Sequence, residues 1–250
     1  MDYAKVADLY DAYVSTTLDI GFFLSESKGR GRVLELMSGT GRVSIPLIEA
    51  GVSLTCVDSS SDMLRILREK LKAKGLDADV READVCELSL GRTFDLIFIP
   101  FHSFSELVTA EEQRMALETI HGHLSGAGRF ICTLHNPEAR LDQVNGKLRL
   151  LGEYPLDRNR GKLVFSTIET YNEADRIVSG TQVYEIYGSS GRLESEMSCD
   201  LRFRLFSRGE FERLAASSGF EVERLYGDYE HGNFRQDESP FMIWVLGKGG

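Results

Sequence analysis

Two glycines and one aspartate have the residue types and the spacing of a nucleoside-binding site. Gly39 and Gly41 follow an apolar stretch at residues 33–36, and Asp58 ends a second apolar stretch that begins at Ser53. Glycine permits a positive φ and lets a ligand approach the backbone without a Cβ in the way. A carboxylate seventeen residues after the second glycine can accept charge-assisted hydrogen bonds from both hydroxyls of a ribose. The pattern therefore indicates a cofactor that contains a nucleoside.

These residues need two parallel strands to bring them together. We expect strands at residues 33–36 and 53–57 with a helix at residues 42–50 between them, because open α/β sheets bind ligands at the carboxyl ends of their strands. These residues also have a purely structural interpretation. A Gly-x-Gly alone is weak evidence of a binding site, and Asp58 could instead begin a helix or a turn. The rest of the chain must decide between the two interpretations.

Beyond Asp58 the chain continues to alternate between strands and helices. Asp84 and Val85 come just after a third strand. The later expected elements are strands at residues 94–100, 129–134, 220–226 and 241–246 and helices at residues 110–123 and 208–217. A dinucleotide-binding half of a dehydrogenase would also contain a glycine loop followed by an acidic residue.

This order of motifs resembles the class I S-adenosylmethionine-dependent methyltransferases, and the resemblance covers nearly the whole chain apart from residues 138–205. It implies a doubly wound α/β fold with a seven-stranded Rossmann-like sheet. The last two strands of that sheet would form an antiparallel hairpin, which a dehydrogenase lacks. Residues 1–137 and 206–250 would then form the core that binds S-adenosyl-L-methionine.

The resemblance also implies a role for each residue that matches a family motif. The implied cofactor contacts are Glu35, Gly39 and Gly41 beneath the methionine part, Asp58 at the ribose, Met63 in the adenine wall, Asp84 and Val85 at the adenine edge, and Ile99 at the start of the loop that faces the methyl group. One position departs from the family pattern, because Met37 stands where the first of three glycines is usual. If position 37 needs a positive φ, methionine costs about 1 kcal/mol of strain, which a fold can tolerate.

Two tyrosines near the N-terminus are further candidates for the cofactor site. Tyr10 and Tyr13 are three residues apart and therefore lie on one face of a helix. Such a stripe also fits an amphipathic helix that only packs on the sheet. Many small-molecule methyltransferases begin with a similar Tyr-Asp-x-x-Tyr, and this resemblance implies that a tyrosine hydroxyl closes over the carboxylate of the cofactor.

Residues 138–205 form an insert for which we predict four mostly antiparallel strands, at residues 147–154, 162–171, 177–187 and 194–205. In the last of them, Leu201, Phe203 and Leu205 alternate with Arg202 and Arg204. A sheet with one apolar face must cover either the mouth of the active site or a partner subunit. The amino-sugar N-methyltransferases have a comparable sheet for substrate cover and dimerisation, so the resemblance implies a small-molecule acceptor and a possible homodimer.

Two histidines are the candidate catalytic residues. Methyl transfer is an in-line displacement at a sulfonium carbon, and a base is needed only when the nucleophile arrives protonated. His102 and His135 follow the fourth and fifth strands at the same sheet edge, and an unperturbed histidine titrates near 6.5, which suits proton removal at neutral pH. Each could instead be a hydrogen-bonded loop histidine.

The other histidines and the cysteines give weaker signals. His121 and His123 end a helix, where a cation favours the dipole, and we expect them to be structural, whereas nothing in the sequence decides the role of His231. No pair of histidines has the spacing of zinc ligands, so no metal is expected. The four cysteines are scattered without a Cys-x-x-Cys pair, which favours reduced thiols.

Composition narrows the choice of partner and compartment. The 250 residues carry a formal net charge of -10 at pH 7, which repels nucleic acid at long range. The sequence has no apolar run long enough for a membrane helix and no apolar stretch of a signal peptide at its start. We therefore expect a cytoplasmic protein with neither a nucleic acid nor a membrane as partner.

The function that these observations favour is transfer of a methyl group from S-adenosylmethionine to a nitrogen, or less readily an oxygen, of a small metabolite. One alternative is a protein that binds the cofactor or its product S-adenosylhomocysteine without turnover, because Met37 could have impaired the site. A nicotinamide-dependent oxidoreductase is a remote alternative, and it requires that the last two strands do not form a hairpin.

Overall fold

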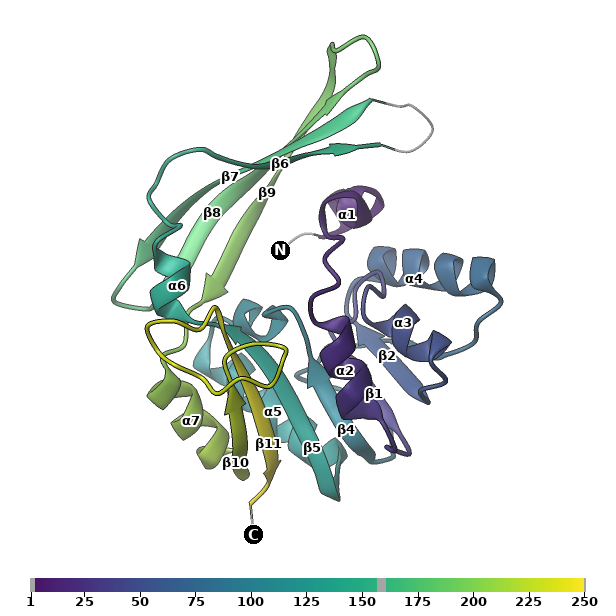
Figure 1. The fold of residues 1–250 in the computed structure, drawn as a ribbon, viewed down its shortest axis with the longest axis vertical. Helices are drawn as coiled ribbons and strands as arrows, with labels where there is room; N and C mark the ends of the chain where they lie inside the picture. Colours follow the sequence, from purple (N-terminus) through teal and green to yellow (C-terminus); the bar gives the residue numbers. More distant parts are fainter. Residues whose placement is uncertain (1–2, 157–160, 250) are drawn as a thin grey trace.

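The protein contains two β-sheets, a large one at the centre of the fold and a smaller one above its upper edge (Figure 1). The computed structural model describes residues 3–156 and 161–249. The seven strands of the large sheet lie in the order β10-β11-β5-β4-β1-β2-β3. They are β1 (Val33–Leu36), β2 (Leu54–Asp58), β3 (Asp79–Glu82), β4 (Phe94–Ile99), β5 (Leu124–His135), β10 (Phe220–Tyr226) and β11 (Phe241–Lys248).

The strand directions confirm the predicted fold class. β1 pairs in parallel with β2 and with β4, whereas β11 is antiparallel to both β5 and β10. The chain runs outward from β1 to β3 and then returns to form β4 beside β1, so the boundary between β1 and β4 is the switch point at which such sheets bind ligands. β10 and β11 also form the antiparallel hairpin. The oxidoreductase alternative required that these strands not form a hairpin, so the structure argues against it.

Helices cover both faces of the large sheet because its inner strands are apolar on both sides. In β4, Leu96 and Phe98 face one core while Ile97 and Ile99 face the other, and all four are fully buried. Helices α2, α3 and α4 pack on the first core and α5 and α7 on the second (Figure 1). The helices are α1 (Ala7–Tyr13), α2 (Ile20–Ser27), α3 (Ser44–Glu49), α4 (Ser61–Lys74), α5 (Ala110–His123), α6 (Pro137–Leu141) and α7 (Arg208–Ser217), with short 3-10 turns η1 (Tyr3–Lys5) and η2 (Ser103–Glu106).

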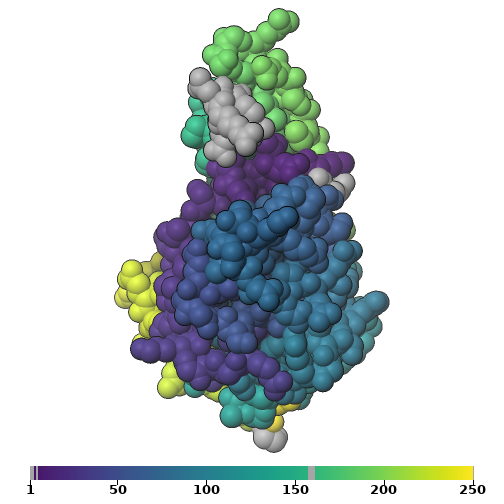
Figure 2. Space-filling model, turned by 90° about the vertical axis from the view of Figure 1, so that its right-hand side faces the viewer, coloured from purple at the N-terminus to yellow at the C-terminus, as the bar shows by residue number. Residues whose placement is uncertain are grey.

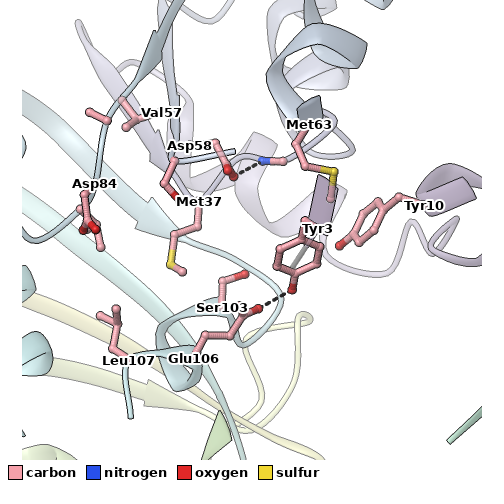
Figure 3. A pocket seen from close by; sticks show the side chains of 14 residues that line it. Tyr3, Tyr10, Met37, Val57, Asp58, Met63, Asp84, Ser103, Glu106 and Leu107 are labelled. Atoms are coloured by element: carbon pink, nitrogen blue, oxygen red, sulfur yellow. Dashed lines mark hydrogen bonds between the residues drawn. The ribbon is translucent and has the colours of Figure 1, made fainter. Parts of the chain in front are cut away.

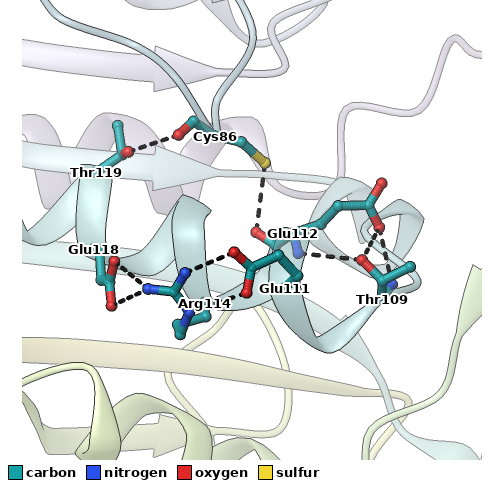
Figure 4. A network of polar contacts seen from close by, with 7 residues as sticks. All are labelled: Cys86, Thr109, Glu111, Glu112, Arg114, Glu118 and Thr119. Carbon is teal, nitrogen blue, oxygen red and sulfur yellow. Dashed lines mark hydrogen bonds and ion pairs between the residues drawn. The ribbon is translucent and has the colours of Figure 1, made fainter.

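The N-terminus of α5 is fixed by a capping box. The Thr109 hydroxyl accepts the Glu112 N–H, and the Glu112 carboxylate accepts the Thr109 N–H (Figure 4). The same helix holds the segment after β3, because the Cys86 thiol donates to the Glu112 carbonyl at 3.4 Å and the Thr119 hydroxyl donates to the Cys86 carbonyl at 3.1 Å. Helix α5 therefore positions the turn that immediately precedes Cys86.

The small sheet has four antiparallel strands in sequence order, β6 (Arg149–Pro155), β7 (Lys162–Asn172), β8 (Ile177–Tyr187) and β9 (Leu193–Arg204). All four lie within the predicted insert at residues 138–205. Alternation along β9 places Leu201 and Phe203 in the wall of a cavity above the large sheet, whereas Arg202 between them is exposed. The apolar face of the insert therefore covers part of the same chain.

Helix α1 lies between the two sheets and contacts both. Tyr13 packs against Phe165 and Tyr184 of the small sheet, with ring centroids 4.5 Å and 5.4 Å apart. On its other side, Asp11 accepts the Thr40 hydroxyl at 2.6 Å and forms an ion pair with Lys70 of α4. Figure 2 shows these N-terminal residues as a band between the insert above and the core below. Helix α1 thus links the insert to the loop that follows β1.

The clearest boundary difference from the prediction is in β5. This strand begins at Leu124 rather than at residue 129, because residues 125–128 interrupt the pairing with β4 without ending the strand. Helix α3 is slightly shorter than predicted, since Pro46 has no N–H to bond the Arg42 carbonyl. The other predicted bounds agree with the structure within two residues.

Candidate active site

A cavity of about 220 Å³ lies at the carboxyl ends of β1 and β2 (Figure 3). We call it the smaller cavity. Its wall brings together six of the residues predicted to contact the cofactor, namely Tyr10, Gly39, Asp58, Met63, Asp84 and Val85. The wall also contains four residues that were not predicted from the sequence, namely Tyr3, Ser103, Glu106 and Leu107.

Asp58 joins the glycine loop to the end of β2. Its Oδ2 accepts the Gly39 N–H at 2.7 Å, and its Oδ1 accepts the Ser60 N–H at 2.8 Å. Gly39 has a φ of 54°, which glycine adopts without strain. Burial raises the pKa of the Asp58 carboxyl. The backbone N–H of Ser59 also stabilises the carboxylate. The aspartate therefore does have the turn role of the alternative interpretation, yet the four lone pairs of its two oxygens still leave room for a ligand hydroxyl.

The other two positions of the glycine loop differ from each other. Met37 has a φ of 56° and lines the smaller cavity, so this position does need the left-handed backbone and methionine bears its strain of about 1 kcal/mol. Gly41 has a φ of 83°, but a Cβ there would lie only 2.3 Å from Leu67 Cδ1 of α4. Gly41 thus permits close packing of the loop on α4 and is not among the residues that line the cavities at this sheet edge.

Glu35 is buried beneath the glycine loop. Its Oε2 accepts the Ser44 hydroxyl at 2.5 Å. Burial raises the pKa of its carboxyl to about 8, although Ser44 and Arg42 oppose this shift. Glu35 lines a third, very small cavity together with Tyr10 and Gly39, so it lies next to the smaller cavity rather than in its wall.

The tyrosines near the N-terminus differ in position. Tyr10 lines both the smaller cavity and a larger cavity of about 540 Å³ beside it, whereas Tyr13 lines only the larger one. Tyr3 also lines both cavities, and its hydroxyl donates to Glu106 at 2.5 Å (Figure 3). Tyr3 precedes Tyr10 by seven positions, and residues seven apart lie on the same face of a helix. Extending the stripe of Tyr10 and Tyr13 towards the N-terminus would therefore have predicted Tyr3 as a site residue. Nothing in the sequence indicated Glu106.

The larger cavity lies between the carboxyl ends of β4 and β5 and the inner face of the small sheet. It contains His102 and His135 on the side of the large sheet and residues of all four strands of the insert on the other. Its polar lining residues are Tyr3, Tyr10, Tyr13, His102, Ser103, Glu106, His135, Arg140, Gln143, Arg149, Glu169 and Gln182.

The loop after β4 places His102 in this wall. Phe101 and His102 have φ values of 54° and 64° in succession, a backbone that costs non-glycine residues about 1–3 kcal/mol each and that clusters at functional sites. The His102 ring stacks on the His135 ring with centroids 3.7 Å apart. Ile99, the predicted start of this loop, has its side chain fully buried in the core, and Phe101 and His102 face the larger cavity instead.

Burial and nearby positive charge favour the neutral form of both histidines. Burial lowers the pKa of His102 to about 3, and the charge of Arg140 adds to this shift. Burial, His102 and Arg140 together hold the pKa of His135 well below its ordinary value. Both pKa values are thus shifted below the unperturbed 6.5 on which the sequence prediction relied, which makes each ring a weaker proton acceptor than an ordinary histidine. A catalytic role for either histidine stays a prediction. The buried Nδ1 of His102 has no hydrogen-bond partner among the described residues, so it remains open to a ligand.

We expect the ring resonances of His102 to show no protonation between about pH 5 and pH 8 in a magnetic-resonance titration of the folded protein. The pKa in the folded state lies below the ordinary 6.5, so the neutral ring stabilises the fold above pH 6.5 and this stabilisation is lost as the pH falls towards 3. The urea-unfolded chain is the control, in which every histidine should titrate near its ordinary pKa. A folded-state midpoint near 6.5 would restore His102 as a candidate base.

Comparison with known proteins identifies the family. Residues 33–128 match the family described as a methyltransferase domain. The chain is 30% identical over 199 residues to the cypemycin N-terminal methyltransferase of a Streptomyces species, an alignment that covers 79% of this chain and 75% of that protein. The chain belongs to the S-adenosylmethionine-dependent methyltransferases. S-adenosylmethionine is accordingly the methyl donor of this methyltransferase.

Two further comparisons extend over nearly the whole methyltransferase. The glycine/sarcosine N-methyltransferase of Aphanothece halophytica is 28% identical over 251 residues, which cover 98% of this chain and 87% of that protein. The solved structure of an S-adenosylmethionine-dependent methyltransferase from Clostridium acetobutylicum has a TM-score of 0.81 at 18% identity and covers 99% of both chains. The resemblance to sugar N-methyltransferases is confirmed at the level of the fold.

The remaining histidines of the methyltransferase lie away from the two cavities. His123 Nε2 accepts the Leu90 N–H at 2.9 Å, and the His121 ring packs edge-on against Phe220, so both make structural contacts. The nitrogen of His123 that accepts this N–H carries no proton, so this ring is not the cation that the helix dipole would favour. His231 lies beside Glu26, with 3.1 Å between Nε2 and the carboxylate. The described residues contain no cluster of three or more side chains suited to a metal ion, and none of their helices is long and apolar enough to cross a membrane.

Proposed function

We propose that this methyltransferase moves the methyl group of S-adenosylmethionine to an amine nitrogen of a small metabolite. The observation that carries the proposal is a common wall, because Tyr3, Tyr10, Ser103 and Glu106 line both cavities. A donor in the smaller cavity and an acceptor in the larger one would meet at this wall. Alignment of two bound reactants can supply about 7–11 kcal/mol of a barrier.

In the smaller cavity, the nucleoside of the donor would take the place that the family resemblance implies. Asp58 would accept the ribose hydroxyls, since its oxygens keep free lone pairs beside their backbone partners. Asp84 and the backbone of Val85 would contact the adenine edge, with Met63 as the wall. The methionine part would then extend past Tyr10 towards the buried Glu35.

Nitrogen is favoured over oxygen because of the protonation state of the larger cavity. An alcohol is a weak nucleophile unless a base removes its proton, and His102 and His135 have lowered pKa values that make them poor bases. A neutral amine has its lone pair available and needs no base. Two relatives support the same choice, since their names describe an N-terminal methyltransferase and a glycine/sarcosine N-methyltransferase.

The transfer itself conserves charge between donor and acceptor. The amine lone pair attacks the sulfonium methyl, the carbon–sulfur bond breaks, and the positive charge moves from sulfur to nitrogen. Glu106 lies at the common wall, where burial raises the pKa of its carboxyl and a bound sulfonium would favour its charged form. The neutral Nδ1 of His102 would orient the amine by accepting one of its N–H groups or donating to an adjacent oxygen.

The insert at residues 138–205 would act as the substrate cover. Its β6, β7, β8 and β9 all contribute residues to the larger cavity, for example Leu151, Glu169, Gln182 and Leu201. The same face packs on α1, so its apolar side is occupied within one chain. A homodimer stays a prediction.

The proposal is tested with trideuteromethyl S-adenosylmethionine and matched pairs of small amines and the corresponding alcohols, with products identified by mass spectrometry. We expect the label on nitrogen only. The apparent kcat/KM should rise with pH through the pKa of the amine itself and show no inflection from a histidine near 6.5. Label on the alcohol oxygen, or a histidine inflection, would contradict the proposal.

A further inference from the structure

Two arginines in the larger cavity share a single carboxylate. Arg140 of α6 forms an ion pair with Glu169 of β7, and Arg149 at the start of β6 approaches the same oxygen, with 4.0 Å between Nη2 and Oε2. The other oxygen of Glu169 accepts the Thr167 hydroxyl at 3.2 Å. The side chains of Glu169 and Arg140 are only 5% and 11% exposed. The Arg149 side chain is 33% exposed. This group of charges therefore carries one positive charge in excess, with a buried ion pair beside a partly exposed arginine.

The arginines also have N–H groups that nothing uses. Arg140 Nη1 and Arg149 Nε are buried and have no hydrogen-bond partner within the described ranges 3–156 and 161–249. A buried donor without a partner is costly, particularly when it belongs to a charged group. The planar guanidinium presents its donors in a fork that matches the oxygens of a carboxylate or a phosphate.

The other carboxylate that lines the larger cavity, Glu106, lies at the common wall with the smaller cavity and does not pair with these arginines. The charge of Arg140 also contributes to the lowered pKa of both His102 and His135, which line the same cavity. Glu106 accepts the Tyr3 hydroxyl. The larger cavity is therefore positive beside the insert and negative where the methyl group would arrive.

The size of the cavity adds a condition on the acceptor. A volume of about 540 Å³ falls within the range that binds drug-sized ligands and far exceeds what a molecule of a few atoms would fill. Apolar side chains such as Leu201 and Phe203 also line it.

We propose that Arg140 and Arg149 form an oxyanion subsite, and that the acceptor is an amine with a carboxylate or phosphate at its far end. The oxyanion takes the unused guanidinium N–H groups and the amine reaches the common wall. This inference rests on the proposed N-methyltransferase function and adds the class of acceptor to it.

The test uses Arg149→Gln, because this change leaves the buried pair of Arg140 and Glu169 intact. Arg202→Gln is the matched control, since Arg202 also belongs to the insert but is exposed on the opposite face of β9. Binding of inorganic phosphate and of acetate is measured by calorimetry on the protein saturated with S-adenosylhomocysteine. We expect at least one of the two to bind, about tenfold more weakly in Arg149→Gln and unchanged in Arg202→Gln.

Turnover on matched amines distinguishes the two sources of the oxyanion. The pairs are amino acids with their amides, and amino sugars with their phosphates. We expect the anionic member of one pair type to be preferred, with a KM about tenfold higher and a nearly unchanged kcat in Arg149→Gln. A preference for amino acids indicates a carboxylate, and a preference for sugar phosphates indicates a phosphate.

The outcomes separate this inference from the proposed function. Equal methylation of neutral and anionic amines overturns the subsite while N-methylation stands. If no amine is methylated, the proposed function fails, and the calorimetric result alone decides the subsite. Absence of binding by both anions, or equal binding in Arg149→Gln and the parent protein, also overturns it.

Discussion

Replacing Leu201 with Trp should abolish most methyl transfer while leaving the affinity for S-adenosylmethionine unchanged. Leu201 lines the larger cavity and not the smaller one, so a bulkier ring there occupies the space of the acceptor. Because the residue borders open space, the ring need not overpack the core. We expect kcat/KM to fall about 100-fold, equivalent to about 2.7 kcal/mol, with cofactor affinity within about twofold of the parent.

The control is Arg202→Trp, the same new side chain at the neighbouring, outward-facing position of β9. This variant should keep both turnover and cofactor binding. If Leu201→Trp turned over at the parental rate, the larger cavity would not be the acceptor site. Thermal unfolding of both variants shows whether any loss reflects the fold instead.

Asp58→Ala should weaken the binding of S-adenosylhomocysteine by about 1–3 kcal/mol in a calorimetric titration. The change removes the charged acceptor proposed for the ribose and also frees the Gly39 N–H, which Asp58 now holds at 2.7 Å. The affinity of Asp58→Asn for S-adenosylhomocysteine should lie between those of the parent protein and Asp58→Ala, because the amide keeps one carbonyl oxygen. Asp77→Ala, at an exposed position of the loop before β3, should bind as the parent does. Unchanged affinity in Asp58→Ala would remove this residue from the cofactor site.

The sequence predicted the features that depend on local pattern. Glycine-rich turns, buried strands and amphipathic helices each leave a local signal, so the positions of most helices and strands and of the insert followed from it. The seven-stranded sheet and its antiparallel hairpin were implied by the family resemblance instead. The alternation of Leu201 and Phe203 with arginines likewise predicted an inner and an outer face of β9. The carboxyl-edge rule then placed Asp58, Asp84 and His102 at one end of the sheet.

Features that depend on packing between distant segments could not be predicted. Tyr3 of η1 and Glu106 of η2 are 103 residues apart and meet only in the folded protein. Arg140 of α6 and Glu169 of β7 are likewise 29 residues apart and meet only in the folded protein. The neutral state of His102 is a property of its burial against His135 and Arg140, which no spacing in the sequence reports. Gly41 was predicted from the family pattern, but its contact with Leu67 is tertiary.

The most direct test of the account is a crystal structure of the protein with S-adenosylhomocysteine bound. We predict the ribose beside Asp58, the adenine beside Asp84 and Val85, and the sulfur at the wall formed by Tyr10, Ser103 and Glu106, facing the larger cavity. A sulfur that faced away from this cavity, or a nucleoside bound elsewhere, would contradict the account.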